Sequence, residues 1–308
     1  MTCAITPGRM GFCRSKQNID GVLYAVQYGR YCSLAVDPME KKPLYHFHPG
    51  SRILSIGNNS CNLSCGFCQN WRISQEPTLT EEITPGQLVE LARREHSIGV
   101  AFTYAEPLMW YEFLLDACSA LKQAELKTVL VTNGSIQLDP LRELLPFIDA
   151  MNIDVKSMRE AFYKRHCGGS LAHVLKSVAA AHEAGCHVEV TMLLIGGVND
   201  SESEIDDLVT WLAGIDPNIP LHFSRYFPNY RFTEQATPIP VILRCRAFAM
   251  KRLSHVYAGN VADIEANSSY CHACGRCIIS RDGYRLTGVY IHDGACDHCG
   301  ASNAFIGT

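Results

Sequence analysis

Three cysteines within eight residues, Cys61, Cys65 and Cys68, constrain this chain more than any other feature of its sequence. Their spacing is C-x3-C-x2-C, and a short apolar stretch at 53–56 precedes them. Three thiolates can hold three irons of a 4Fe–4S cluster and leave the fourth iron without a protein ligand. The alternatives are three buried cysteines or half of a zinc site, but structural zinc favours four ligands in two pairs. We therefore predict a cluster with one open position, at which a small molecule can bind and be activated.

The cysteine content and the charge limit where this chain works and what it binds. The chain has 308 residues with 15 cysteines, and its N-terminus lacks the basic-then-apolar pattern of a signal peptide. In a reducing compartment so many thiols favour metal or cluster ligation over disulfides, so we expect a cytoplasmic protein. The net charge of −4 gives no electrostatic argument for nucleic acid, and no apolar run is long enough to span a bilayer. We expect neither a membrane nor a nucleic acid as a partner.

Strand and helix patterns alternate from about residue 51 onward. Predicted strands lie at 53–56, 99–104, 127–132, 149–155, 187–195 and 219–224, and predicted helices at 85–96, 107–124, 138–147, 170–184, 201–214 and 240–253. This alternation implies βαβ units and a parallel sheet. The sequence therefore predicts an α/β fold, with a partial TIM-like (β/α)6 barrel at 51–258. An irregular N-terminal cap at 1–50 and a small module at 259–308 would flank it.

Polar residues follow the predicted strands at the end where a parallel barrel carries its chemistry. Glu106 follows the second strand, and Thr132-Asn133 follows the third. In the fourth strand Asn152, Asp154 and Lys156 alternate with apolar residues, so the three share one face. This face either binds a ligand or carries a plain Asp154–Lys156 ion pair that fills the barrel.

These motifs together resemble the radical S-adenosylmethionine (SAM) superfamily, and more closely its AmmeMemoRadiSam type. That type is similar to the pyruvate formate-lyase activating enzyme and is named after gene neighbours of the AMMECR and Memo types. Besides the cysteine triplet, the segments that carry the resemblance are Asp37–Ser51, Cys68–Gln75, Thr103–Pro107, Val131–Gly134, Ile153–Lys156, Val198–Asp200 and His222–Pro228.

The resemblance implies a role for each matching residue. Cys61, Cys65 and Cys68 would ligate the cluster, and Phe67 would lie against the adenine of SAM. Glu106 would accept a hydrogen bond from the SAM amino group, although Tyr104 and Ala105 replace the two glycines that usually precede it. The ribose and carboxylate side of SAM would be lined by Thr132, Asn133, Asp154 and Lys156.

The resemblance also implies a reaction. The cluster would cleave SAM reductively to a 5′-deoxyadenosyl radical that abstracts hydrogen from a substrate, with a flavodoxin- or ferredoxin-type protein as electron donor. A protein or peptide substrate, as in activating enzymes, is the leading interpretation. Modification of a small metabolite is the alternative within enzymes, and a non-catalytic iron–sulfur electron carrier is the alternative outside them. A carrier has no need of a SAM pocket.

The C-terminal module carries a second metal motif. Cys271-His-Ala-Cys274 and Cys296-Asp-His-Cys299 are two C-x2-C pairs separated by 21 residues, which is typical of a zinc ribbon. A glycine follows each pair and permits the tight turn of a knuckle. The additional Cys277 leaves open a second iron–sulfur cluster. We expect Asp282-Gly283 to form a hairpin turn.

The other candidate ligands have simpler explanations. His46 and His48 form an H-x-H pair, but no third ligand is evident, so we interpret them as part of a packed loop. We assign no metal to Cys3, Cys13 and Cys32. The scattered cysteines are expected to be small buried residues: Cys118, Cys167, Cys186 and Cys245.

Overall fold

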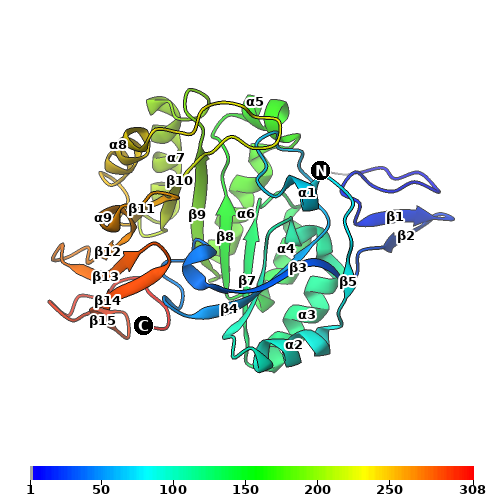
Figure 1. Ribbon diagram of the computed structural model, residues 1–308, viewed down its shortest axis with the longest axis horizontal. Helices are drawn as coiled ribbons and strands as arrows, with labels where there is room; N and C mark the ends of the chain where they lie inside the picture. Colours follow the sequence, from blue (N-terminus) through cyan, green and yellow to red (C-terminus); the bar gives the residue numbers. More distant parts are fainter. Residues whose placement is uncertain (1–2) are drawn as a thin grey trace.

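The computed structural model describes residues 3–308 and contains a nine-stranded central sheet (Figure 1). The strand order is β11-β10-β9-β8-β7-β6-β4-β3-β5. Neighbouring strands from β4 to β11 run parallel, and β3 pairs antiparallel with both β4 and β5. The strands are β3 (Arg30–Pro38), β4 (Arg52–Asn58), β5 (Glu81–Glu82), β6 (Gly99–Phe102), β7 (Lys127–Thr132), β8 (Ala150–Asp154), β9 (His187–Leu194), β10 (Leu221–Arg225) and β11 (Val256–Gly259).

Helices alternate with these strands as the sequence predicts. Six longer ones are α2 (Pro85–Arg94), α3 (Tyr111–Gln123), α4 (Leu138–Leu144), α6 (Leu171–Glu183), α7 (Glu202–Ile215) and α8 (Ile239–Ala249). Shorter turns are η1 (Met39–Lys41), α1 (Trp71–Ser74), η2 (Pro107–Trp110), η3 (Leu145–Phe147), α5 (Glu160–Phe162), the π-helical turn η4 (Tyr163–Cys167) and α9 (Ile264–Asn267). Local sequence explains where they start: Thr84 caps α2 in a reciprocal capping box with Gln87, and Pro85 occupies the first helical position.

The two faces of the sheet bury different side chains because neighbouring strand residues point to opposite faces. Residues such as Leu130, Ile153 and Val190 pack with the helices in the main hydrophobic core. Their neighbours on the other face include Val129 and Ala150, which form a second, smaller core with Met39, Leu44, Phe47, Ile53 and Ala101. We call this second side the inner face, and the candidate site lies on it.

The segment 39–50, which follows β3, covers one end of the inner face. Asn152 of β8 donates to the carbonyl oxygen of Pro43 at 2.8 Å, and the backbone N–H of His46 donates to the buried Glu189 of β9 at 2.8 Å. His222 of β10 also bonds to Glu189, at 2.6 Å. We call the segment 39–50 the floor segment, because it closes the inner face at the end where the parallel strands begin.

The C-terminal part is a small β module of three short strands and one longer hairpin. It contains β12 (Ser269–Tyr270), β13 (Cys277–Asp282), β14 (Arg285–Val289), β15 (Ile291–His292) and β16 (Ala295–Cys296). Gly283 has a φ of 59° between β13 and β14, which confirms the predicted hairpin turn. Arg281 anchors the module: its guanidinium is fully buried and donates to the carbonyl oxygen of Tyr45 at 2.7 Å.

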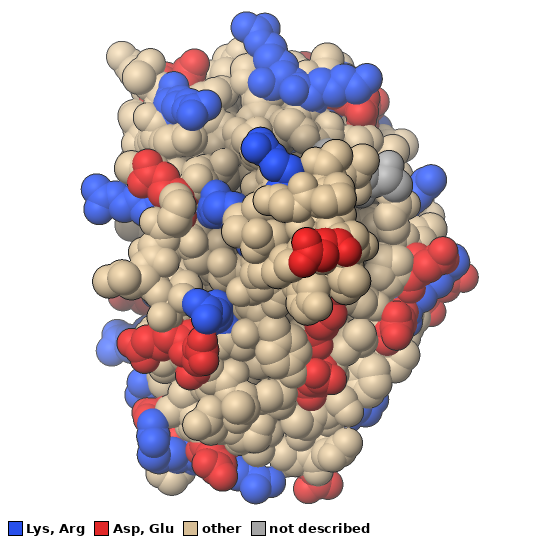
Figure 2. Space-filling model, turned by 90° about the vertical axis from the view of Figure 1, so that its right-hand side faces the viewer, with Lys and Arg blue, Asp and Glu red and all other residues tan. Residues whose placement is uncertain are grey.

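At the other end of the chain, β1 (Lys16–Ile19) and β2 (Val22–Ala25) form a separate hairpin. On the face of the molecule shown in Figure 2, acidic and basic side chains are interspersed, with several basic ones at the upper edge. None of the helices in residues 3–308 has the length and apolar character needed to cross a membrane.

Candidate active site

The three clustered cysteines follow β4 and line one cavity of about 540 Å³ at the inner face. Backbone hydrogen bonds fix their loop: Ser64 N–H donates to the oxygen of Cys167 at 2.8 Å, and Gly66 N–H to the oxygen of His166 at 3.1 Å. The three thiols are free of disulfides. An all-thiol donor set facing a cavity suits an iron–sulfur cluster, because such clusters are held by cysteine thiolates. The residues present therefore fit the cluster that the spacing predicts.

Cys167 lies beside this loop, in a way that the sequence did not reveal. It is fully buried, as predicted, and its backbone oxygen holds the cysteine loop through Ser64. The neighbouring Cys167 thiol, together with burial, raises the pKa of the Cys65 thiol well above its usual value. A thiol next to a cluster ligand can influence the cluster, because hydrogen bonds to the sulfurs tune its reduction potential.

Glu106 accepts more hydrogen bonds than the other carboxylate that lines the cavity. Its two oxygens accept hydrogen bonds from the Thr132 hydroxyl at 2.6 Å, from Asn133 N–H at 2.8 Å and from Leu108 N–H at 3.0 Å. Burial raises the pKa of Glu106 to about 7, against the lowering effect of these donors. The side-chain amide of Asn133 in turn lies 3.8 Å from the sulfur of Cys61. The structure thus joins three predicted site residues, Glu106, Thr132 and Asn133, into one network beside the cysteines.

Asp154 and Lys156 form the ion pair that the sequence left open as an alternative. The Lys156 ammonium lies 2.9 Å from Asp154, and both residues line the cavity. Burial would lower the pKa of Lys156, but Asp154 and the thiols of Cys65 and Cys167 hold it well above its usual value. The Asp154 side chain is 37 % exposed, so its carboxylate remains accessible to a ligand.

Phe67 is buried and also lines the cavity. Its ring packs against Phe162 and Phe232 at centroid distances of 5.8 and 5.4 Å. Tyr104, which stands where a glycine is usual, adopts a φ of 70° in the left-handed region. Residues other than glycine rarely adopt this conformation. The side chain of Tyr104 extends toward the floor segment.

The sequence did not predict the far end of the cavity. The carboxylate of Asp37 accepts hydrogen bonds from Lys41 at 2.8 Å, Lys42 at 2.7 Å and the Tyr104 hydroxyl at 2.7 Å. These three donors hold the pKa of Asp37 well below its usual range, although burial opposes them. Other cavity residues missed by sequence reasoning are Thr191, Ser224, Asn260 and Tyr284.

Cys271, Cys274, Cys296 and Cys299 converge at a second place, in the C-terminal module. Their sulfurs lie within 4.8 Å of one another, with separations of 3.7 Å between Cys271 and Cys299 and 3.9 Å between Cys274 and Cys296. A tetrahedron with metal–sulfur bonds of about 2.3 Å has edges of about 3.8 Å. The four thiols are therefore spaced for a single tetrahedral ion. Within the part of the chain described, no other group of His, Cys, Asp or Glu residues converges in this way.

The remaining candidate ligands lie elsewhere. His46 is buried: its Nδ1 donates to the carbonyl oxygen of Ala304, its Nε2 forms a hydrogen bond with the Tyr257 hydroxyl, and its ring stacks on Phe305 at 3.8 Å. It therefore ties the floor segment to the module, in agreement with the packed-loop interpretation. Cys277 is half-buried and does not belong to the four-cysteine group.

Comparison with known proteins identifies the family. The family model described as the radical SAM superfamily matches residues 55–212, which is about half of the chain. An uncharacterized protein of Methanocaldococcus jannaschii is 40 % identical over 309 residues, covering 97 % of this chain and 91 % of that protein. This chain belongs to the radical SAM superfamily and is an enzyme; membership implies a 4Fe–4S cluster and SAM.

Two more distant relatives are named after an enzymatic activity. A probable GTP 3′,8-cyclase of Methanosarcina mazei is 26 % identical, over 79 % of this chain and 78 % of its own length. The 4-hydroxyphenylacetate decarboxylase activating enzyme of Clostridium scatologenes is 25 % identical, over 47 % of this chain and 48 % of its own. Streptococcus suis SuiB bound to S-adenosylmethionine shares the fold, with a TM-score of 0.55 at 14 % identity over 68 % of this chain and 52 % of SuiB.

Proposed function

We propose that this enzyme cleaves SAM reductively at a 4Fe–4S cluster held by Cys61, Cys65 and Cys68. The observation that supports this proposal is that these thiols line the same cavity as Glu106, Thr132, Asn133, Asp154 and Lys156. When bound, the cluster and SAM together would supply a 5′-deoxyadenosyl radical that abstracts hydrogen from the substrate. A non-catalytic electron carrier would have no use for this row of polar side chains beside its cluster.

The chain's own residues would bind and orient SAM. Glu106, held by Thr132 and the Asn133 backbone, presents its carboxylate near the cysteine loop, where it would accept a hydrogen bond from the SAM amino group. Asp154 and Lys156 would bind the ribose and carboxylate side, and Phe67 would pack against the adenine. Because Lys156 stays protonated beside Cys65 and Asp154, it also offsets negative charge at the cluster site.

The finer identity that we propose is an AmmeMemoRadiSam-type enzyme acting on a protein or peptide, with partial-barrel geometry around the cavity. Similarity to an activating enzyme supports this substrate class. A small metabolite is the second candidate, because the chain matches more of a probable GTP 3′,8-cyclase than of the activating enzyme. A flavodoxin- or ferredoxin-type donor would deliver the electron, and AMMECR- or Memo-type proteins would be functional neighbours.

For the C-terminal module we propose a zinc ribbon. The sulfur separations of 3.7 and 3.9 Å support one tetrahedral zinc ion over an iron–sulfur cluster. Four thiolates close such a site, so its role would be structural.

The test is SAM cleavage by anaerobically reconstituted, reduced protein, with 5′-deoxyadenosine and methionine measured by mass spectrometry. Substituting alanine for Cys61, Cys65 or Cys68 should abolish both cluster absorbance and cleavage. Cys118→Ala, a buried cysteine of α3 outside the cavity, is the matched control and should retain both. Full cleavage by a triplet variant would refute the proposal.

A further inference from the structure

The end of the cavity formed by the floor segment carries an excess of positive charge. Lys41 and Lys42 both line the cavity, and both are paired with the same carboxylate, that of Asp37. One negative charge therefore faces two ammonium groups. Glu106 and Asp154, the carboxylates that line the cavity, are engaged by Thr132 and Lys156 instead.

Two buried side chains that line the cavity have hydrogen-bonding capacity that the described residues leave unused. The side chain of Lys42 is 2 % exposed, yet its ammonium, with three N–H groups, has Asp37 as its one hydrogen-bond partner within residues 3–308. Thr191 is 7 % exposed, lines the cavity, and its hydroxyl has no partner in the same part of the chain. Buried polar groups are costly unless they find a partner.

Both groups belong to the same cavity, since Lys42 and Thr191 line it together. Pro43, next to Lys42, is tied to Asn152 on the inner face of β8. Two residues further along the same face of β8 is Asp154, and its register partner on β9 is Thr191. Thr191 therefore stands beside Asp154, and the Lys42 ammonium enters the cavity from the floor segment, where it is held by Asp37.

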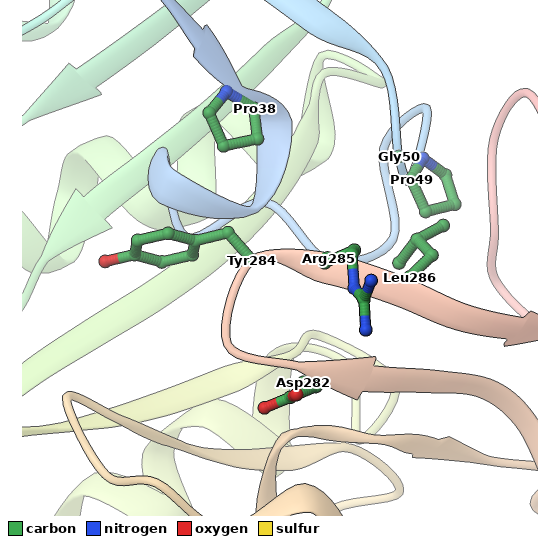
Figure 3. A pocket seen from close by; sticks show the side chains of 7 residues that line it. All are labelled: Pro38, Pro49, Gly50, Asp282, Tyr284, Arg285 and Leu286. Atoms are coloured by element: carbon green, nitrogen blue, oxygen red, sulfur yellow. The ribbon is translucent and has the colours of Figure 1, made fainter.

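The rim of this end comes from the C-terminal module. Tyr284, at the tip of the β13–β14 hairpin, lines the cavity together with Lys41 and Lys42. It also lines a surface depression between the hairpin and the floor segment. Figure 3 shows its ring directed away from Arg285 and Leu286, beside the turn that follows Pro38.

We propose that Lys41, Lys42 and Thr191 form a subsite for an anionic group of the substrate, a carboxylate or a phosphate. This inference rests on the proposed function, because it assigns the substrate end of the same cavity. The two ammonium groups supply charge and N–H donors, the Thr191 hydroxyl supplies a further donor, and Asp37 with Tyr104 holds the lysines in place. SAM would occupy the cysteine end, bound by Glu106 and Asp154, and the anionic group would lie between Thr191, which is next to Asp154, and the lysines of the floor segment.

Binding of small anions to the SAM-loaded, reconstituted protein tests the subsite. Isothermal titration would use glutarate, inorganic phosphate and the capped tripeptide acetyl-Gly-Glu-Gly-amide. Neutral glutaramide and the corresponding Gln tripeptide are the controls. We expect at least one charged probe to bind and its neutral counterpart to bind at least tenfold more weakly. The best probe then tells whether the anion is a free carboxylate, a phosphate or a peptide side chain.

Variants locate the binding. Lys42→Met should weaken the best probe by about ten- to hundredfold, as expected for a lost charge-assisted hydrogen bond. Thr191→Val keeps the shape and breaks no protein hydrogen bond, so it should fold normally and weaken the probe by about two- to tenfold. Lys164→Met removes an exposed lysine outside the cavity and should change nothing.

The outcomes separate this inference from the proposed function. If no charged probe binds, or if Thr191→Val and Lys42→Met bind like the wild type, the subsite is refuted even when SAM cleavage is intact. If SAM is not cleaved but the probes bind and the variants weaken them, the anion subsite stands and the proposed reaction falls.

Discussion

Removing the metal ligands of the C-terminal module should unfold the module and leave the cysteine-triplet site intact. The perturbation is the double substitution Cys271→Ser with Cys274→Ser, which removes one of the two knuckles. The apolar core of the module contains only a few large buried side chains: Ile278, Ile279, Ile291 and Phe305. At about 1.5–3 kcal/mol each, they contribute about 6–12 kcal/mol. Binding of a structural zinc ion contributes about 10–16 kcal/mol, so the proposed zinc ion would stabilise the module as much as its entire apolar core does.

Hydrogen exchange measured by mass spectrometry would report this loss directly. Peptides from residues 269–306 should lose protection in the double variant, whereas peptides from β6 to β9 and the iron content should stay unchanged. Cys277→Ser is the matched control, since this thiol lies outside the four-cysteine group, and it should keep both the metal and the protection. Unchanged protection after metal loss would refute the reasoning. About eight irons with no zinc in the wild type would instead assign the module to a second cluster.

Four further predictions concern the residues of the cavity, Cys167 beside it and the buried Glu189. Glu106→Ala and Asp154→Ala should each weaken SAM binding about ten- to hundredfold while iron content is preserved, as equilibrium dialysis of reconstituted protein would show. SAM affinity of the wild type should rise as the pH increases through about 7, because only the ionised form of Glu106 accepts the amino N–H without a competing proton; Glu106→Gln should flatten this profile. Cys167→Ala should shift the cluster potential measured by redox titration with electron paramagnetic resonance, at unchanged iron content, and an unchanged potential would mean that Cys167 only fills space. Glu189→Ala should lower the free energy of unfolding by about 3–5 kcal/mol in urea at pH 7, because it leaves buried groups such as His222 unpaired. The histidine partners depress the pKa of Glu189 despite its burial. The wild type should therefore lose this contribution to its free energy of unfolding as the pH falls through that depressed pKa.

The regular part of the fold could be predicted because its signals are local. Each parallel strand from β4 to β10 and each of the six longer helices overlaps the range predicted from hydrophobic pattern. The inward direction of Asp154 also followed from alternation, since Ile153 packs in the core under the helices. The strand β11 was missed, because Val256–Gly259 is short and lacks a distinct pattern. The strand β3 was missed because it lies in a region punctuated by turns, and only its pairing with β4 defines it.

The candidate site likewise has a part that the sequence predicts and a part that it does not. Thr132 ends β7, Asn133 follows it, and Glu106 lies in the loop after β6, so the position of the strand ends predicts that they meet. The Asp37–Lys42–Tyr104 cluster has no such signal, because Tyr104 reaches it from another strand through a left-handed backbone conformation. Cys167 was predicted only to be a small buried residue. Its contact with Cys65 depends on how the π-helical turn η4 packs against the cysteine loop, which no local pattern encodes.

The metal module and the floor of the cavity behave as one structural unit. Arg281, on β13, is fully buried, bonds to the carbonyl oxygen of Tyr45 and lies 4.4 Å from the centre of its ring. Tyr45 belongs to the floor segment, three residues after Lys42, and the same hairpin carries Tyr284 to the rim. A guanidinium buried in this way can be held only by partners in fixed positions, because an unpaired buried charge is costly. The zinc ion proposed at the four-cysteine site would order β13 at its start, so loss of this ion should disturb Arg281 and then the floor segment. The cysteine-triplet end rests on β4, β6 and β7 instead, which explains how the substrate end of the cavity can depend on the metal module while the SAM end does not.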